Sequence, residues 1–574
     1  MRPIGVAAST SWPCGCGEFI TAQPTIGKVT FAPPLENSVP EASDNARRSL
    51  PGWQSSDELP GVHAEDLGTS PGAARKVPAP VFGPTDRRRG WIVALIITAI
   101  GAITRFANLG SPTDKGTPVF DEKHYVPQAW QVLTGDNWLE DNPAYGLVVH
   151  PPVGKWMIAI GEWLFGYDAW GWRFMSAVCG TLMILIVVRL VRRLTRSTLV
   201  GAIAGVLMIV DGVTFVASRT GLLDIFQIFF ILAALAAIVC DRDQMRARMH
   251  KVYSEGRIHD SPYGPRLGFR WWRFAAAIAL GLACGTKWSG IYFVIFFIVL
   301  SLGFDVAARK AYLVQRPWRG VLLRDVIPTG FSLGVTPVLI YLATFAPWFS
   351  SETAVYRYEV GRQIGTGGPF AWVPDAWRSL WYYESGVLSF HSNLTNSAGN
   401  HHPWESKPWT WPMGLRPMLY YIEYGPEKCG ESECVKAMMF IGTPIMWWLA
   451  LPMLAWALWR MFIRRDWRYA VVLVGYGAAY LPWFTNLDRQ MYFFYATAMA
   501  PFLIMGLALC VGDVLAASRR ATKYAYEKRQ VDAVAVSIYL GLAVANFMWM
   551  WPILTGEPIS REMWNMQMWL PSWT

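Results

Sequence analysis

The stretch Arg87-Arg-Arg-Gly-Trp-Ile-Val-Ala-Leu-Ile-Ile-Thr-Ala-Ile-Gly-Ala-Ile-Thr-Arg-Phe106 decides the class of fold. Three arginines precede an apolar run of the kind that crosses a bilayer as a helix. A basic cluster before a first span tends to keep that end of the span in the cytoplasm. The sequence therefore predicts a membrane protein whose first span covers residues 91–106 and leads outward.

The composition of the whole chain agrees with this prediction. Of the 574 residues, 53% are hydrophobic and 16% charged, whereas soluble domains carry about 25% charged residues. These values exclude a disordered or collagen-like protein and argue against a large soluble enzyme. The net charge of +10 comes from basic clusters between apolar runs, which is typical of cytoplasmic membrane loops, so we expect no nucleic acid partner.

Ten further apolar runs follow the first, and together they predict an all-α polytopic fold with about eleven transmembrane helices. They cover residues 170–188, 198–216, 222–240, 273–285, 288–305, 326–346, 437–459, 469–484, 490–512 and 533–551. The predicted cytoplasmic loops hold 26 Lys and Arg residues, and the longer predicted outer segments hold 14. This bias predicts a cytoplasmic N-terminus and an extracytoplasmic C-terminus.

The chain divides at about residue 85. Residues 1–85 are rich in Pro, Gly, Ser and Ala and predict a disordered cytoplasmic tail. Residues 86–574 predict a single transmembrane domain. Two of its outer segments, 107–169 and 347–436, are long enough to build a site.

An adjacent acidic pair, Asp121 and Glu122, lies in the first outer segment. Adjacent side chains of a helix point in different directions, so the two carboxylates are expected to have different roles. A solvated charge run is the alternative. Further along, His150-Pro-Pro-Val-Gly-Lys155 predicts the start of a short amphipathic helix at the outer interface, with Lys155 at headgroup depth.

Charged residues recur at the predicted outer ends of the spans. They are Asp121, Lys155, Arg173, Arg219, Asp224, Lys287 and Arg489. Their convergence on one side of the membrane predicts a site with several cations around a few carboxylates. Arg and Lys bind phosphate oxygens and would stabilise a departing lipid phosphate, and one carboxylate could deprotonate an acceptor hydroxyl.

The second outer segment offers less definite signals. His401, His402 and Glu405 could bind a metal, but no further ligand set accompanies them. Trp404 could stack on a sugar or line the interface. On the oxidising side of the membrane, we expect a disulfide between Cys429 and Cys434. The sequence shows no nucleotide-binding motif.

Seven motifs in order resemble the protein O-mannosyltransferases, which are glycosyltransferase family 39 enzymes of the GT-C class. The motifs are Phe120-Asp-Glu-Lys-His-Tyr125, His150-Pro-Pro-Val-Gly-Lys155, Trp172-Arg-Phe174, Leu222-Leu-Asp224, Gly281-Leu-Ala-Cys-Gly-Thr-Lys-Trp288, His402-Pro-Trp-Glu-Ser-Lys-Pro-Trp409 and Arg489-Gln-Met-Tyr-Phe-Phe494. The resemblance implies transfer of mannose from polyprenyl-phosphate mannose to Ser or Thr hydroxyls, with inversion, at the outer face. It also implies no obligate metal or other cofactor.

The resemblance further implies roles for single residues. Asp121 would be the catalytic base and Glu122 would bind substrate or hold the site. Expected contacts to the donor phosphate and sugar come from His150, Lys155, Arg173, Asp224, Lys287 and Arg489. Expected contacts to the acceptor or sugar come from His402 and Trp404.

The segment 347–436 is too short for the MIR domain of eukaryotic members, so the chain resembles a bacterial, actinobacterial type. The expected acceptors are then exported proteins, and the Sec translocon is an expected partner in the cell membrane. One alternative is a GT-C enzyme with a glycolipid acceptor. Another is a transporter, although transporters carry their ionisable residues near the bilayer midplane.

Overall fold

The computed structural model describes residues 77–78, 87–135, 149–399, 401–429, 432–520 and 525–574. The predicted disordered tail lies outside these ranges, apart from residues 77 and 78. Val77 packs on a small apolar cluster that includes Met249 and Ile258. The hydroxyl of Tyr312 donates a hydrogen bond to the carbonyl oxygen of Pro78 at 3.3 Å.

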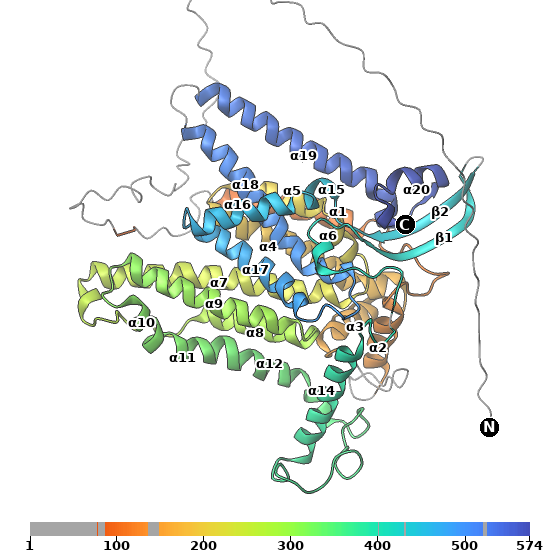
Figure 1. Cartoon of the computed structure of the whole chain (residues 1–574), viewed down its shortest axis with the longest axis horizontal. Coiled ribbons are helices and arrows are strands. Elements are labelled where there is room, and N and C mark those ends of the chain that lie inside the picture. Colours follow the sequence, from red (N-terminus) through yellow and green to blue (C-terminus); the bar gives the residue numbers. More distant parts are fainter. Residues whose placement is uncertain (1–76, 79–86, 136–148, 400, 430–431, 521–524) are drawn as a thin grey trace, which may run out of the picture. The chain divides into compact units, whose positions relative to one another are not determined.

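Most of the described chain is helical (Figure 1). The longer helices are α1 (Arg87–Phe106), α2 (Glu122–Thr134), α3 (Val153–Phe165), α4 (Ala169–Thr195), α5 (Thr198–Ile209), α7 (Leu223–Ser254), α8 (Trp271–Thr286), α9 (Gly290–Ala311), α12 (Thr336–Thr344), α14 (Asp375–Asn393), α16 (Ala450–Phe462), α17 (Trp467–Tyr480), α18 (Ala500–Arg520) and α19 (Ala525–Thr555). The shorter ones are α6 (Gly212–Ala217), α10 (Pro317–Arg324), α11 (Val326–Thr329), α13 (Ala346–Ser350), α15 (Pro444–Trp447) and α20 (Arg561–Gln567).

Each of the eleven predicted spans overlaps a helix, but eight stretches of the described chain are long and apolar enough to cross a membrane. The other three predicted spans correspond to α5, α8 and α17, which have 12, 16 and 14 residues. The predicted span 198–216 is broken because Asp211 caps a new helix: its carboxylate accepts a hydrogen bond from the Thr214 backbone N–H at 2.8 Å.

The all-α prediction was wrong in one region, because the structure contains a three-stranded antiparallel sheet. Its strands are β1 (Met418–Cys429), β2 (Ser432–Phe440) and β3 (Pro558–Ser560), in the order β1-β2-β3. The predicted span 437–459 therefore begins only at Pro444. Short apolar runs fit a buried strand as well as a helix, which explains the error. A disulfide joins Cys429 to Cys434 across this hairpin.

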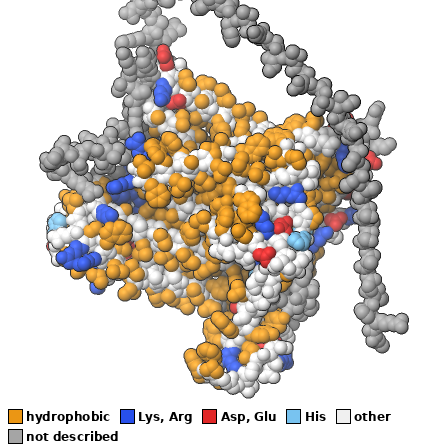
Figure 2. All heavy atoms as spheres, in the orientation of Figure 1, with side chains coloured by type: hydrophobic (Ala, Val, Ile, Leu, Met, Phe, Trp, Pro, Cys, Tyr) orange, Lys and Arg blue, Asp and Glu red, His pale blue; other side chains and the backbone are white. Residues whose placement is uncertain are grey.

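Elements predicted to lie on opposite sides of the membrane are found at opposite ends of the helices (Figure 1). The elements of the two long outer segments, α2, α3, α14 and β1, lie at one end, together with α20. The helix α10 and the turn after α7, both predicted to be cytoplasmic, lie at the other end. In Figure 2 the surface between these ends is mostly hydrophobic.

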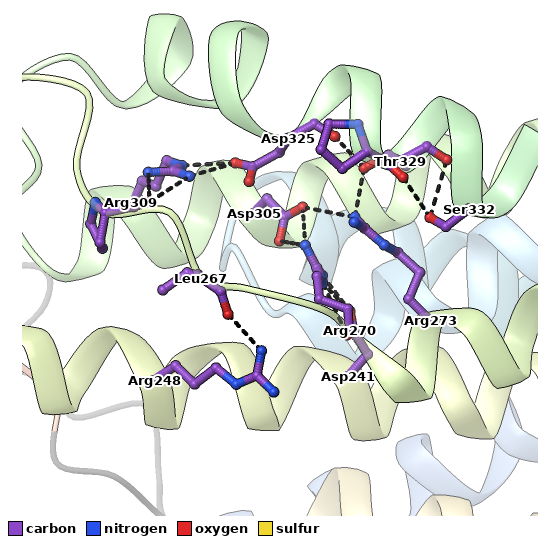
Figure 3. Close-up of polar contacts among 12 residues, drawn as sticks. Asp241, Arg248, Leu267, Arg270, Arg273, Asp305, Arg309, Asp325, Thr329 and Ser332 are labelled. Atoms are coloured by element: carbon purple, nitrogen blue, oxygen red, sulfur yellow. Dashed lines mark hydrogen bonds and ion pairs between the residues drawn. The ribbon is translucent and has the colours of Figure 1, made fainter.

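A buried polar network ties the helices together at the predicted cytoplasmic end (Figure 3). The guanidinium of Arg270 donates to Asp241 on α7 and to Asp305 on α9, with distances of 3.0 Å and 2.8 Å for one bond to each. Arg273 donates to the hydroxyl of Thr329 at 2.6 Å. Because every group is buried, the network sets the spacing of α7, α8, α9 and α11.

Helices α3 and α4 approach each other without any side chain between them. A Cβ added to Gly161 on α3 would lie 2.2 Å from the carbonyl oxygen of Gly171 on α4. Real Cβ atoms do not come so close to a carbonyl oxygen, so this contact requires glycine. It fixes the C-terminal half of α3, the helix that carries Lys155 near its start, against α4.

We expect Gly161→Ala to push α3 away from α4 and to lower the thermal stability of the detergent-solubilised protein by about 1–3 kcal/mol. Gly303→Ala on α9 is the matched control, because nothing lies within 4 Å of a Cβ at that position. Alanine also has the better helix propensity, so the control is expected to be neutral or stabilising. Equal melting temperatures for the two variants would contradict the close contact.

Candidate active site

The two adjacent carboxylates of the first outer segment have separate environments, as their spacing predicted. Glu122 is fully buried and forms a two-pronged ion pair with Arg173 of α4, with both N–O distances at 2.8 Å. Its carboxylate also accepts hydrogen bonds from the backbone N–H groups of Gly221 at 2.7 Å and Val119 at 3.1 Å. Glu122 therefore holds segments of the fold together and has no free acceptor for a substrate.

Asp121 directly precedes α2, makes no side-chain capping hydrogen bond to it, and follows a residue with an unusual backbone. Phe120 has a φ of 50°, in the left-handed region that non-glycine residues rarely adopt. Its ring stacks on Tyr420 of β1 at 4.2 Å and meets Phe494 edge-on at 5.7 Å. These rings hold the turn in place, so the position of Asp121 depends on β1. Strained residues of this kind are frequent at functional sites.

The Asp121 carboxyl is partly buried, and among the described residues none donates a hydrogen bond to it. Burial raises its pKa to about 6, even though the nearby Lys287 and His124 charges act to lower it. The charge of Asp224, a second carboxylate, raises the pKa of Asp121 further. Lys287 donates to Asp224 at 2.8 Å, which places a carboxylate–lysine pair beside Asp121.

Lys155 and His150 lie on the same site. The prediction of a helix after Pro152 is confirmed by α3, and Lys155 is fully buried inside the protein. Its ammonium donates to the carbonyl oxygen of His150 at 2.9 Å. Burial keeps the pKa of the His150 imidazole well below its usual value, and the charges of Lys287, Lys155 and Arg489 lower it further.

Arg489 reaches the site from the segment before α18 and is held by the end of α14. Its guanidinium donates to the carbonyl oxygen of His391 and lies 3.3 Å from the His391 Nδ1. The His391 ring lies 5.6 Å from that of His150. Burial and the charge of Arg489 lower the pKa of His391 to about 4, so both imidazoles are neutral near pH 7.

Five of the seven charged residues predicted to converge form one linked group, because Lys287 and Asp224 lie near Asp121 while Lys287, Lys155 and Arg489 lie near His150. The other two lie behind this group. Arg173 bonds Glu122 and the carbonyl oxygens of Leu109 and Pro112. Arg219 donates to the last carbonyls of α1, including that of Arg105 at 2.9 Å. Both are buried, and their hydrogen bonds orient backbone segments.

The candidate residues of the second predicted outer segment, His402 and Trp404, lie at the margin of the candidate site. The exposed His402 ring meets Tyr492 edge-on at 5.5 Å, and Tyr492 stacks on Phe494 beside Lys287. Trp404 is covered by the guanidinium of Arg416 at 4.6 Å. Within the described ranges, no three His, Cys, Asp or Glu side chains are placed to hold a metal ion. The expectation of no cofactor remains a prediction.

Two residues near the site were not predicted from the sequence, His391 and Tyr420. Tyr420 is the extra residue of a bulge in β1, because Leu419 pairs with Met439 and Tyr421 with Met438. Bulges near active sites redirect a side chain. Burial raises the pKa of Tyr420 well above its usual value, with Asp224 and Asp121 adding to the effect, so its hydroxyl stays protonated close to both carboxylates.

Comparison with known proteins identifies the family of this chain. Residues 95–351 match the family model for dolichyl-phosphate-mannose-protein mannosyltransferase, and residues 376–573 match a second model, the C-terminal four TMM region of protein-O-mannosyltransferase. A polyprenol-phosphate-mannose–protein mannosyltransferase of Mycolicibacterium smegmatis is 60% identical over 88% of this chain and 96% of its own. The chain belongs to this family of mannosyltransferases.

Other members of the family are similar over the same range. The Mycobacterium tuberculosis member is 59% identical over 87% of this chain and 94% of its own, and the Corynebacterium glutamicum member 43% identical over 83% and 92%. The fold resembles the S. cerevisiae protein O-mannosyltransferase Pmt1–Pmt2 complex bound to the sugar donor. The TM-score is 0.64 at 15% identity, over 86% of this chain and 95% of that one.

We expect Glu122→Leu to destabilise the fold by about 3–5 kcal/mol, because it leaves the buried Arg173 charge and two backbone N–H groups without their acceptor. Lys123→Leu is the matched control one residue away. Its ion pair with Asp114 is exposed, with side-chain exposures of 55% and 46%, and such pairs contribute little. Thermal unfolding of the purified variants checks this, and a Glu122→Leu variant as stable as Lys123→Leu would contradict it.

Proposed function

We propose that this protein transfers mannose from polyprenyl-phosphate mannose to Ser or Thr hydroxyls of exported proteins at the extracytoplasmic face of the cell membrane. The observation that carries the proposal is the grouping of Asp121 with three cationic side chains, Lys155, Lys287 and Arg489. Membership of the mannosyltransferase family supports the donor and the polypeptide acceptor.

The reaction we propose is a single in-line displacement. Asp121 accepts the proton of the acceptor hydroxyl while its oxygen forms a bond to the anomeric carbon of mannose. The bond from that carbon to the phosphate oxygen breaks on the opposite face, so the configuration inverts. The polyprenyl phosphate leaves as an anion and needs no general acid, and Lys155 and Arg489 stabilise its charge.

The contacts assign more specific roles to the residues around Asp121 than the family resemblance alone does. Glu122 and Arg173 are positioning residues, because each is buried and bonded to the other and to backbone groups. Lys287 and Asp224 form a pair that adjusts the charge next to the base. The neutral His150 and His391 fill the space between the cations without adding charge.

The membrane arrangement that we propose follows the sequence analysis. It is a GT-C fold with eleven crossings, in which α5, α8 and α17 cross as short helices, with the N-terminus in the cytoplasm and the C-terminus outside. The basic residues of the loops support it. Acceptors would then arrive from the Sec translocon on the outer side.

The raised pKa of Asp121 predicts the pH dependence of transfer. A base works only when deprotonated, so kcat/KM is expected to fall tenfold per pH unit below about pH 6. An ordinary aspartate would lose activity only below about pH 4. Asp121→Asn is expected to lower kcat by about 10²- to 10⁴-fold at neutral pH.

The variant Asp224→Asn tests whether Asp121 is the base in a way that a general loss of activity would not imitate. Because Asp224 raises the pKa of Asp121, its removal is expected to shift the acidic limb of the pH profile to lower pH. An acidic limb at the same pH in both proteins, or near-normal transfer by Asp121→Asn, would refute Asp121 as the base.

The acceptor is tested directly with a labelled donor. Membranes that contain the protein are incubated with radiolabelled polyprenyl-phosphate mannose and a Ser/Thr-rich peptide. We expect the label to enter the peptide with wild type and not with Asp121→Asn. Label that enters only the lipid extract would favour the alternative of a glycolipid acceptor.

A further inference from the structure

The segment before and within α14 exposes large apolar side chains, although it belongs to a predicted outer loop. We call residues 370–393 the α14 arm. Its most exposed apolar members are Phe370 (67%), Trp372 (80%), Trp381 (77%) and Leu388 (57%). Figure 1 shows α14 and the loop before it projecting from the helices around α12, and Figure 2 shows hydrophobic side chains at the projecting end.

Helix α14 has two different faces. Leu380, Tyr383 and Val387 are buried and form a cluster with Phe345 and Trp348. The other face exposes Trp377, Trp381 and Leu388, spaced four and seven residues apart along one stripe of the helix. A water-facing stripe would be polar, so the exposed aromatic rings indicate an apolar or interfacial environment.

The surroundings of the α14 arm indicate which environment that is. The helix packs on the end of the span Val326–Thr344, whose Val338 and Leu339 side chains face outward. In Figure 1 it runs across the direction of this span instead of continuing it. An amphipathic helix that crosses the spans at their outer end, with Trp on its exposed face, has the character of an interfacial helix.

We propose that the α14 arm lies in the outer leaflet of the bilayer, with Phe370, Trp372 and Trp381 inserted among the lipid headgroups and upper acyl chains. The exposed face continues the lipid-facing surface of α12, so the occupant is the membrane itself and not a protein.

The buried side of α14 connects this membrane contact to the candidate site. Glu384 accepts a hydrogen bond from the hydroxyl of Tyr341, which in turn accepts one from the indole N–H of Trp288 at 3.0 Å. Trp288 is the neighbour of Lys287 in the chain. About two turns after Glu384 in α14, the carbonyl oxygen of His391 accepts a hydrogen bond from Arg489. The depth of α14 in the leaflet thus sets the positions of Lys287 and Arg489. We expect this depth to affect donor binding, an expectation that rests on the proposed function.

The membrane contact is tested by the depth of labels. All cysteines outside the Cys429–Cys434 bridge are first replaced by alanine. Trp372→Cys or Trp381→Cys is then introduced, and the new thiol is labelled with an environment-sensitive fluorophore. The protein is placed in phosphatidylglycerol–phosphatidylethanolamine vesicles that contain a phosphatidylcholine with a nitroxide near the top of its acyl chain. We expect severalfold stronger quenching by this lipid than by aqueous iodide.

Glu562→Cys on α20 is the control, since Glu562 is exposed at the same end of the helices. It is expected to show the reverse preference. Quenching of the labels at 372 and 381 by iodide alone would overturn the proposal. So would protection from both quenchers that disappears when the protein is diluted in lipid, because that result would indicate a second copy of the chain as the occupant.

The link to the site is tested by kinetics in the same vesicles. The double variant Trp372→Ser/Trp381→Ser is expected to raise the KM for polyprenyl-phosphate mannose severalfold, with the KM for the peptide unchanged. Trp318→Ser at the predicted cytoplasmic end, where the side chain is 65% exposed, is the matched control and is expected to behave as wild type. An unchanged donor KM in the double variant would overturn the link. Absence of transfer by wild type would reject the proposed function and leave the quenching result valid.

Discussion

The half of the structure that holds the candidate site depends on the buried ion pair between Glu122 and Arg173. Two charges in a buried environment are stable only when nearly every lone pair and N–H group has a partner. Here the partners come from the start of α2, the start of α4, the 109–112 segment and Gly221 before α7. The ion pair therefore fixes four separate parts of the chain relative to one another. It also fixes the position of Asp121, because Asp121 is the neighbour of Glu122.

The distribution of charge around Asp121 suits a reaction that expels an anion. Three cationic side chains approach from α3, from the segment between α8 and α9, and from the segment before α18. Buried lysines and arginines repel one another, but Asp224 compensates one of them and neutral imidazoles separate others. A phosphate would complete the compensation.

The sequence predicted much of this arrangement, with identifiable gaps. Apolar runs located a helix for every expected span, and charges at the span ends pointed to Asp121, Lys155, Asp224, Lys287 and Arg489. The sequence did not separate these from Arg173 and Arg219, because a charge near a helix end can equally serve a ligand or a backbone carbonyl. It also missed the β1–β2 hairpin, since an apolar run such as Val435–Phe440 of β2 fits strand or helix. Tyr420 and His391 carry no local signal, and only tertiary packing brings them to the site.

The pairing of β3 with β2 has a consequence for how the molecule is assembled. Residues 558–560 follow the last long helix, α19, yet they complete the sheet whose first strand holds Tyr420 against Phe120. During synthesis, this strand can join the sheet only after α19 has been made. The sheet that carries Tyr420 is therefore completed only after the last long helix, so a chain still under insertion would lack a fully formed candidate site while its early helices are already in the bilayer.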